Sequence, residues 1–469
     1  MKTYVDEDSS NWARVLMLAY VIISLIMCGG SIFGFTPLKE ILLDEKVYQE
    51  RCTVGDTLPC EDQLVQLDGM FTLAASLFSA YLLPAGLCLR FLGPRFCFLT
   101  GFALVVLGSW GFAQAPSQYF KLCYVLIGSG NPLLYISALN FGKLYPKSSN
   151  LLLSVFIGCF GFSSVVFYIF QLLHFEWGWS SRQIFSRFST LPILLGMVGI
   201  FILPPYPYHV QREKKLQALL EPKGPDSETT PLNPASVSSS DAELGQEVTL
   251  DDHYHTDDIH PEVVVPLKQR SIGQQLQSPQ FLLQTAFFCW GMLHQNFYLG
   301  TIGDQIYMFA GDDDGLRNVA ATILQKFSIF YPLQCILAIL PVGALVRNCS
   351  VGTSLFVYCT CSTTFSILAL IPNVQVQWAT SALYVVVRVG FFTVMSTYSA
   401  TIFGFQNLGT MFGCAGCLAG LVSLLGSFLS DHALHVDHSF LPVNTILLIG
   451  GLISFVFPVV VTVNQWQKD

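Results

Sequence analysis

Apolar runs of about twenty residues recur along the chain, and shorter polar segments separate them. A run of this length forms a helix that can span the hydrocarbon core of a bilayer. We therefore expect an all-α membrane protein with twelve transmembrane helices in two six-helix halves. The first six are expected at 12–35, 66–89, 96–114, 118–142, 151–173 and 186–204. The second six are expected at 281–310, 319–346, 351–372, 376–401, 406–429 and 440–463.

A long polar segment, 205–278, separates the two groups and is rich in Ser, Pro, Asp, Glu and Lys. Such a composition cannot bury a core, so the segment is expected to be a flexible linker. The chain then divides into an N-terminal bundle (1–204), the linker, and a C-terminal bundle (279–469). Lys and Arg are more frequent on the side of the membrane that holds both termini and the linker, which predicts that this side is cytoplasmic.

The composition excludes several classes of protein. Hydrophobic residues make up 52% of the chain and charged residues only 12%, about half the charged share of a soluble domain. The net charge of −8 argues against a nucleic-acid partner. The chain has no phosphate loop, dinucleotide fingerprint, HExxH motif or plausible catalytic triad, so we expect no enzyme activity, no cofactor and no metal site.

The run 281–310 carries an unusual polar stripe formed by His294, Tyr298, Thr301 and Gln305. Their spacing places all four on one face of a helix. Polar groups that face lipid are costly, so this stripe should face other helices or a water-filled cavity. Lining of a substrate cavity is our expectation, and hydrogen bonding between helices is the alternative. His294 and the nearby Asp304 are candidates for proton coupling, with a buried core histidine and a solvated carboxylate as the alternatives.

Arg388 lies within the expected helix 376–401, where an unpaired cation costs several kcal/mol. One interpretation is that it faces the cavity and binds the carboxylate of a substrate. The other is that it is structural and pairs with Asp304 or with backbone carbonyls.

Small residues within the apolar runs give further candidates for substrate binding. Glycines weaken a helix and expose backbone groups, which suits recognition of an amino or carboxyl group. Close packing of helices is the alternative role. The candidates are Gly30, Ser31 and Gly34 in the first expected helix, and Gly158 and Gly161 in the fifth.

The loop after the first expected helix contains Cys52 and Cys60 and should lie outside the cell. Two cysteines so close together in an oxidising compartment are expected to form a disulfide, with two free thiols as the alternative.

The two halves also resemble each other. Residues 124–130 match 384–390, and residues 156–161 match 412–416, each at the equivalent position of its half. This pattern indicates duplicated halves related by an axis along the membrane normal, with a central site between them.

Several motifs resemble those of known transporters. Residues 86–95 resemble the GxxxDxxGRR loop of the major facilitator superfamily, although Arg90 replaces the usual acidic residue. The sequence 297–301 with Gln305, and the FGF motif at 33–35, resemble the large-neutral-amino-acid facilitators of solute carrier family forty-three and their fungal relatives.

This resemblance implies a facilitative and sodium-independent transporter that works by alternating access, and we expect it to be a monomer. It implies a large neutral amino acid as the substrate. We expect Arg388 and the glycines of the first helix to bind its polar head, and Tyr298, Thr301 and Gln305 to contact the rest. A purine nucleobase transporter is the alternative within transport, and a non-transporting membrane binding protein or receptor is the alternative of another class. The plasma membrane is the expected location, with a lysosomal or vacuolar membrane as the alternative.

Overall fold

The computed structural model describes residues 10–53, 59–141, 149–205, 267–404 and 407–466, and all regular structure within these ranges is helical. The longer N-terminal helices are α1 (Asn11–Cys28), α2 (Phe35–Asp44), α3 (Glu61–Gln114), α4 (Phe120–Asn140), α5 (Ser149–Phe162), α6 (Val165–Phe175), α7 (Ser181–Phe188) and α8 (Thr190–Ile202). The C-terminal helices are α10 (Ile272–Leu276), α11 (Pro279–Ala310), α12 (Asp314–Leu337), α13 (Ile339–Asn348), α14 (Val351–Ala369), α15 (Gln377–Phe403), α16 (Leu408–Ser423), α17 (Leu425–His435), α18 (Leu441–Ile453) and α19 (Val456–Trp466). Short 3₁₀ helices are η1 (Ser31–Phe33), η2 (Gln49–Arg51), η3 (Ser117–Tyr119), η7 (Leu267–Gln269) and η8 (Val374–Val376).

Within the described residues, ten helical segments are long and apolar enough to cross a membrane. One of them is α3, which is kinked at Gly93, where φ is 84° and only glycine is unstrained. Its two limbs correspond to two separately predicted helices. The helix α11 is not one of the ten, because its polar residues lower its mean hydropathy, although its 32 residues are ample for a span.

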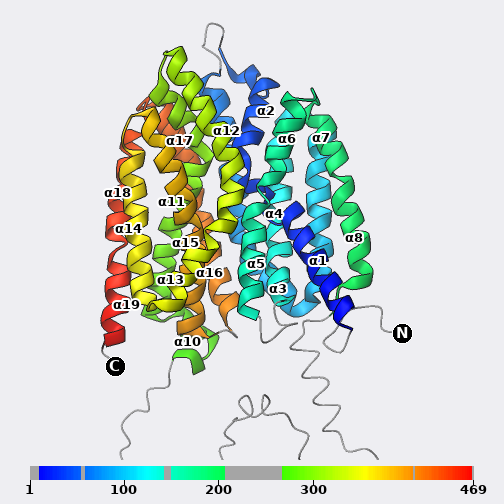
Figure 1. The fold of residues 1–469 in the computed structure, drawn as a ribbon, viewed down its shortest axis with the longest axis vertical. Coiled ribbons are helices and arrows are strands. Elements are labelled where there is room, and N and C mark those ends of the chain that lie inside the picture. The colour runs from blue at the N-terminus through cyan, green and yellow to red at the C-terminus, as the bar shows by residue number, and fades with distance from the viewer. Residues whose placement is uncertain (1–9, 54–58, 142–148, 206–266, 405–406, 467–469) are drawn as a thin grey trace, which may run out of the picture.

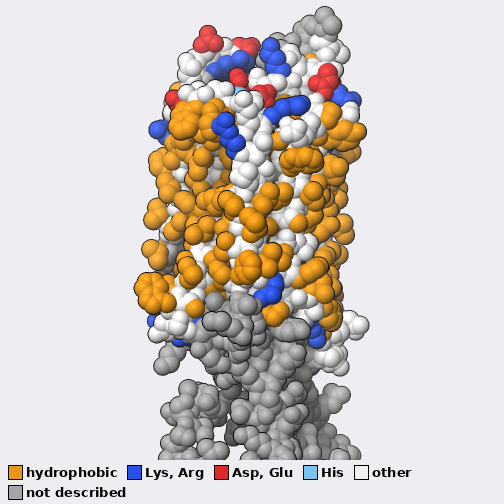
Figure 2. Space-filling model, turned by 90° about the vertical axis from the view of Figure 1, so that its right-hand side faces the viewer, with side chains coloured by type: hydrophobic (Ala, Val, Ile, Leu, Met, Phe, Trp, Pro, Cys, Tyr) orange, Lys and Arg blue, Asp and Glu red, His pale blue; other side chains and the backbone are white. Residues whose placement is uncertain are grey.

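The helices form two bundles that stand side by side (Figure 1). Helices α1–α8 lie in one half and α11–α19 in the other, and α1 begins and α19 ends at the same end of the molecule. A side view shows a broad band of hydrophobic side chains, with Lys, Arg, Asp and Glu gathered above it (Figure 2). Such a band is the surface that a bilayer requires, so the protein crosses the membrane several times.

A disulfide between Cys52 and Cys60 lies at the opposite end of the molecule from the start of α1. The predicted disulfide is therefore present in the structure. We call this end of the molecule the disulfide end.

The expected first and fifth helices are both interrupted. The expected first helix is divided into α1, η1 and α2, and the expected fifth helix is divided into α5 and α6. The two interruptions meet, because the backbone N–H of Gly30 donates to Ser163 Oγ at 3.1 Å. A Cβ atom on Gly30 would lie 2.6 Å from the carbonyl oxygen of Phe160, so only glycine permits this contact.

The two halves pack closely along α3 and α16. A Cβ atom on Gly420 would lie 2.4 Å from the carbonyl oxygen of Ser76, and Gly413 and Gly416 also approach α3 closely. This stripe of small residues lets the two backbones come together as in other membrane helix pairs. On the other side of the interface, α5 packs against α12.

Helical structure resumes before the predicted end of the linker, since η7 and α10 both lie within 205–278. The buried side chain of Gln275 in α10 donates to the carbonyl oxygen of Phe403 at 3.4 Å. Its Oε1 accepts from Asn407 Nδ2 at 3.0 Å. The short helix is therefore docked on the end of α15 and the start of α16. Residues 206–266 of the predicted linker lie outside the described residues.

Candidate functional site

A cavity lies between the two halves, near the middle of the helices. Aromatic side chains dominate its wall, and Arg388 is the one charged side chain among the described residues that line it. The N-terminal half contributes Phe33, Phe78, Leu82, Tyr135, Ile157, Phe160 and Gly161. The C-terminal half contributes Tyr331, Cys335, Arg388, Val389, Phe392 and Phe412.

The cavity is small in this conformation. Its volume is about 40 Å³, and one water needs roughly 10–15 Å³ on the same kind of measure. A few water molecules fit, but an amino acid does not. A bound solute therefore requires the halves, or the rings of Phe33 and Phe160 that pack together at 5.7 Å, to move apart.

Arg388 is buried, with 5% of its surface exposed. Its Cζ lies 4.4 Å from the centre of the Phe33 ring in the opposite half, a cation–π contact. Its NH1 donates to Tyr384 Oη at 3.2 Å, and its NH2 has no hydrogen-bond partner in the structure. Within the described chain no carboxylate pairs with this guanidinium, so a donor group is left for an anionic ligand.

Tyr384 fixes the position of this arginine. Its hydroxyl accepts from Arg388 and donates to the backbone carbonyl of Gln295 in α11 at 3.0 Å. The Tyr384 side chain is fully buried among other aromatic rings, including Tyr298 and Tyr331. The hydroxyl therefore holds NH1 of the guanidinium, whereas NH2 of the same cavity-lining residue is buried without a hydrogen-bond partner.

The polar stripe of α11 does not line this cavity. The rings of His294 and Tyr298 pack against Phe365 of α14. Gln305 donates to Thr301 at 2.8 Å and accepts from Asn444 of α18 at 3.0 Å. The stripe thus faces the interior of the C-terminal half, where neighbouring side chains satisfy Thr301 and Gln305.

The glycines of the predicted site have mixed positions. Gly161 lines the cavity, and a Cβ atom there would lie 2.8 Å from Cys335 Cβ. Gly158 is buried on the same helix without lining the cavity.

Gly30, Ser31 and Gly34 lie beside the cavity, at the break next to the lining residue Phe33, but do not line it. A Cβ atom on Gly34 would meet the carbonyl oxygen of Ser164 at 2.4 Å, so this glycine permits close packing. Two side chains of α4 stabilise the break by hydrogen bonds. Asn131 donates to the carbonyl oxygen of Cys28, and Tyr124 donates to the carbonyl oxygen of Ile32.

The sequence suggested a solvated Asp304 or an Asp304–Arg388 pair, and the structure shows neither arrangement. Asp304 binds Lys39 of α2, whose Nζ lies 2.7 Å from Asp304 Oδ1 and 2.6 Å from Oδ2. The same Nζ lies 2.6 Å from Asp68 Oδ1 of α3. We call these three side chains the buried triad.

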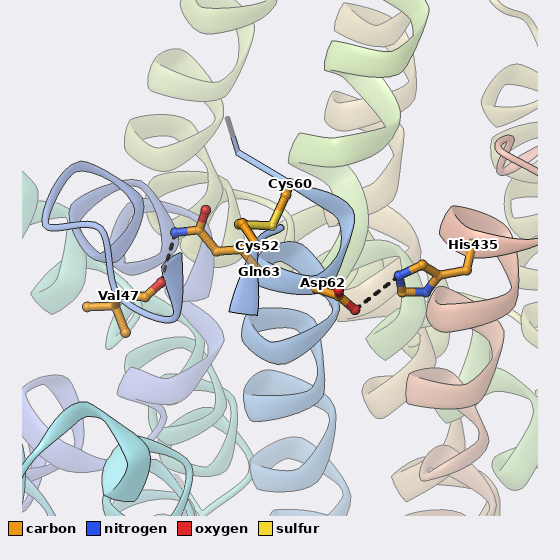
Figure 3. The surroundings of a disulfide bond; sticks show 6 residues. All are labelled: Val47, Cys52, Cys60, Asp62, Gln63 and His435. Carbon is orange, nitrogen blue, oxygen red and sulfur yellow. Dashed lines mark hydrogen bonds and ion pairs between the residues drawn. A yellow bond between two sulfur atoms is a disulfide. The ribbon is translucent and has the colours of Figure 1, made fainter. Parts of the chain in front are cut away.

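Two histidines add contacts between the halves at the disulfide end. His435 Nε2 lies 3.2 Å from Asp62 of α3, close to the Cys52–Cys60 disulfide (Figure 3). His438 Nδ1 lies 3.1 Å from Glu61. These partly exposed pairs form a rim outside the buried triad.

Comparison with known proteins gives related chains of similar length, although no family model matches. Protein FMP42 of Saccharomyces cerevisiae is 26% identical over 93% of this chain and 92% of that protein. Aromatic and large neutral amino acid transporter 5-3 of Toxoplasma gondii is 22% identical over 94% of this chain and 81% of that protein. Equilibrative nucleobase transporter 1 of Bos taurus is 22% identical over 97% of both chains.

The fold also matches a solved structure. The crystal structure of a D-xylose-proton symporter superposes with a TM-score of 0.61 over 96% of this chain and 97% of the symporter, at 12% identity. A likeness at this identity establishes the fold. The relatives whose names state an activity are transporters, which confirms that the chain is not an enzyme. The chain is therefore a multi-pass membrane transporter with the major facilitator fold, related to the large neutral amino acid transporters.

Proposed function

We propose that the protein is a sodium-independent facilitator of large neutral amino acids that works by alternating access. In this proposal the two limbs of α3 cross the membrane separately and α11 also crosses, which gives twelve spans in two six-helix halves. Both termini and the linker are cytoplasmic, and the disulfide end faces the outside of the plasma membrane, where disulfides persist.

The observation that carries the proposal is the unpaired side of Arg388 in the central cavity. A buried guanidinium without an acidic partner is costly unless a ligand compensates its charge. The α-carboxylate of an amino acid would supply two oxygen acceptors for that side. Tyr384 would keep the guanidinium oriented toward the ligand, as its hydrogen bond at 3.2 Å indicates.

The rest of the cavity suits a large apolar side chain. The ring centres of Phe33, Phe78 and Phe160 lie within 6 Å of one another. These rings could surround an aromatic or branched group once the cavity widens. For the α-ammonium we propose backbone oxygens at the helix break near Gly30, because no acidic residue lines the described cavity.

The test is uptake of labelled phenylalanine or leucine into proteoliposomes in sodium-free buffer. Arg388→Ala should abolish saturable uptake, Arg388→Lys should retain a weaker response, and Tyr384→Phe should raise KM. The matched control is Arg347→Ala, which removes an exposed arginine outside the cavity. Unchanged uptake by Arg388→Ala would refute the carboxylate contact, and uptake at the level of empty vesicles would favour a non-transporting binding protein.

A purine nucleobase remains the second candidate, because one relative is named a nucleobase transporter and planar rings dominate the cavity. A neutral base has no carboxylate for Arg388 to bind. Labelled adenine uptake that competes with unlabelled hypoxanthine but not with phenylalanine would select this candidate.

A further inference from the structure

Three charged side chains are buried together in the wall between the two halves. The exposed fractions of Lys39, Asp68 and Asp304 are 5%, 1% and 8%. One ammonium nitrogen contacts both carboxylates, at 2.6 Å from Asp68 Oδ1 and 2.6 Å from Asp304 Oδ2. A single ammonium group therefore bridges the two carboxylate groups.

The buried triad joins the two halves. Lys39 and Asp68 belong to the N-terminal half, whereas Asp304 belongs to the C-terminal half. From α17 of the C-terminal half, Ser430 Oγ donates to Asp68 Oδ2 at 2.8 Å. Separation of the halves at the disulfide end would break both the Lys39–Asp304 and the Ser430–Asp68 contacts.

The triad lies between the central cavity and the disulfide end. Phe35, the first residue of α2, follows the cavity residue Phe33 by two residues, and Lys39 lies roughly 6 Å further along α2. Between them, Phe35 stacks on Phe71 at 5.1 Å, and Phe71 packs against Gly300 of the opposite half. A closed gate thus separates the cavity from the disulfide end, with an apolar layer below and a charged layer above.

The charges in this layer do not balance. One ammonium faces two carboxylates, so the triad carries a net charge of −1 if all three groups are ionised. Burial of an uncompensated charge is strongly unfavourable. Among the described residues, the charged groups that act on Lys39 and Asp68 are the other members of the triad. The helix α17 adds only the neutral hydroxyl of Ser430.

Opening of the gate would change this balance. The N-terminal half would keep Lys39 and Asp68 as a neutral pair, and Asp304 would enter water as a lone carboxylate. Two ionised carboxylates beside one ammonium are unfavourable in the closed gate, where all three groups are buried, and become favourable once water reaches the open gate. The two conformations therefore differ in their affinity for a proton.

We propose that the carboxyl pair Asp68–Asp304 binds one proton from the outer solution each time this gate closes. The inference rests on the proposed alternating access and on the outward orientation of the disulfide end. Acidic outer solution stabilises the closed gate, and alkaline solution favours its opening. Because the triad stays closed while the opposite side opens, the proton returns to the outside and is not carried across with the substrate.

The rim histidines form separate ionisable contacts between the halves, His435 with Asp62 and His438 with Glu61. These pairs are partly exposed, so their contribution should be small and sensitive to salt. A variant with His435→Gln and His438→Gln separates the rim from the buried triad.

The test is hydrogen–deuterium exchange of the detergent-solubilised or nanodisc-embedded full chain between pH 5.5 and 8, corrected for intrinsic exchange rates. For the wild type, the amide protection factors in α2 and in the last turns of α11 should rise as the pH falls. If one proton is bound, these factors should rise by up to about tenfold per pH unit. Asp304→Asn imitates the protonated carboxyl, so its protection should be high and independent of pH. The histidine double variant should keep most of the wild-type response.

Two outcomes would overturn the proposal. One is an unchanged pH response in both Asp304→Asn and Asp68→Asn, and the other is its complete loss in the histidine double variant. Proton entry measured with a pH-sensitive dye during substrate uptake would also contradict it, because the proton would then be co-transported. Exchange needs no substrate, so its result is independent of whether amino acids are the cargo.

Discussion

Replacement of Lys39 by methionine removes the cation of the buried triad and keeps a side chain of similar length. The closed gate then contains Asp68 and Asp304 without the ammonium that now contacts both. No other cation contacts these two carboxyl groups in the described structure. The substitution should therefore destabilise the closed gate and favour the conformation in which the two halves separate at the disulfide end.

The magnitude follows from the geometry. Two contacts of 2.6 Å to one nitrogen place the carboxylate oxygens at most about 5 Å apart. At that distance, and at an effective dielectric constant of about 20, two negative charges would repel by roughly 3 kcal/mol, so the closed gate keeps one proton and Lys39→Met leaves a single carboxylate without its counter-charge. Removal of one partner from a buried ion pair costs about 3–5 kcal/mol in other proteins. Since about 1.4 kcal/mol is a factor of ten, the closed-to-open ratio should fall at least about 100-fold.

Distances between spin labels can measure this shift. Glu176 and Asp314 are exposed at the disulfide end of the two halves, and cysteines there can carry nitroxide labels. Lys39→Met should lengthen the distance between the labels at pH 8, whereas Lys39→Arg and the exposed-site control Lys326→Met should not. An identical distance distribution in wild type and Lys39→Met would refute the view that this cation holds the gate closed.

Two further predictions concern stability. Gly420→Val should lower the unfolding free energy by about 1–3 kcal/mol, because a Cβ atom there meets the carbonyl oxygen of Ser76 at 2.4 Å. Thermal unfolding in detergent measures this change. The control is Gly451→Val, because a Cβ atom at Gly451 would meet open space. Cys60→Ser should lower stability by roughly 2 kcal/mol, because the disulfide closes a loop with a sequence separation of 8. Mass spectrometry should first show that the wild-type preparation contains the Cys52–Cys60 bond. A Cys60→Ser variant that then melts at the wild-type temperature would contradict the second prediction.

The apolar runs predicted the helices well, because hydrophobic length is what a bilayer imposes on a chain. They did not predict where helices are interrupted. The first run appeared continuous through Gly29 and Gly30, yet the chain leaves the helix there to bring Gly30 against Ser163. Such a break depends on a contact between distant segments, which hydropathy does not encode.

The site was only partly predictable for a related reason. Arg388 was identifiable because a cation in an apolar run is costly and needs a partner. The aromatic lining was not, since Phe33 or Phe160 at a cavity resembles any buried phenylalanine. Lys39 lies beyond the expected helix 12–35, so hydropathy alone does not place it in a helix. Its extension into α2 and its two carboxylate partners emerge only in the folded chain.

The docking of α10 has a mechanical consequence for Arg388. The helix α15 is continuous over 27 residues, about 40 Å, and Arg388 lies near its middle. Its last residue, Phe403, accepts a hydrogen bond from Gln275 of α10. Because α10 leads directly into α11, this hydrogen bond links the start of α11 to the end of the helix that carries the guanidinium. A displacement of the start of α11 would therefore be transmitted along α15 to the wall of the central cavity.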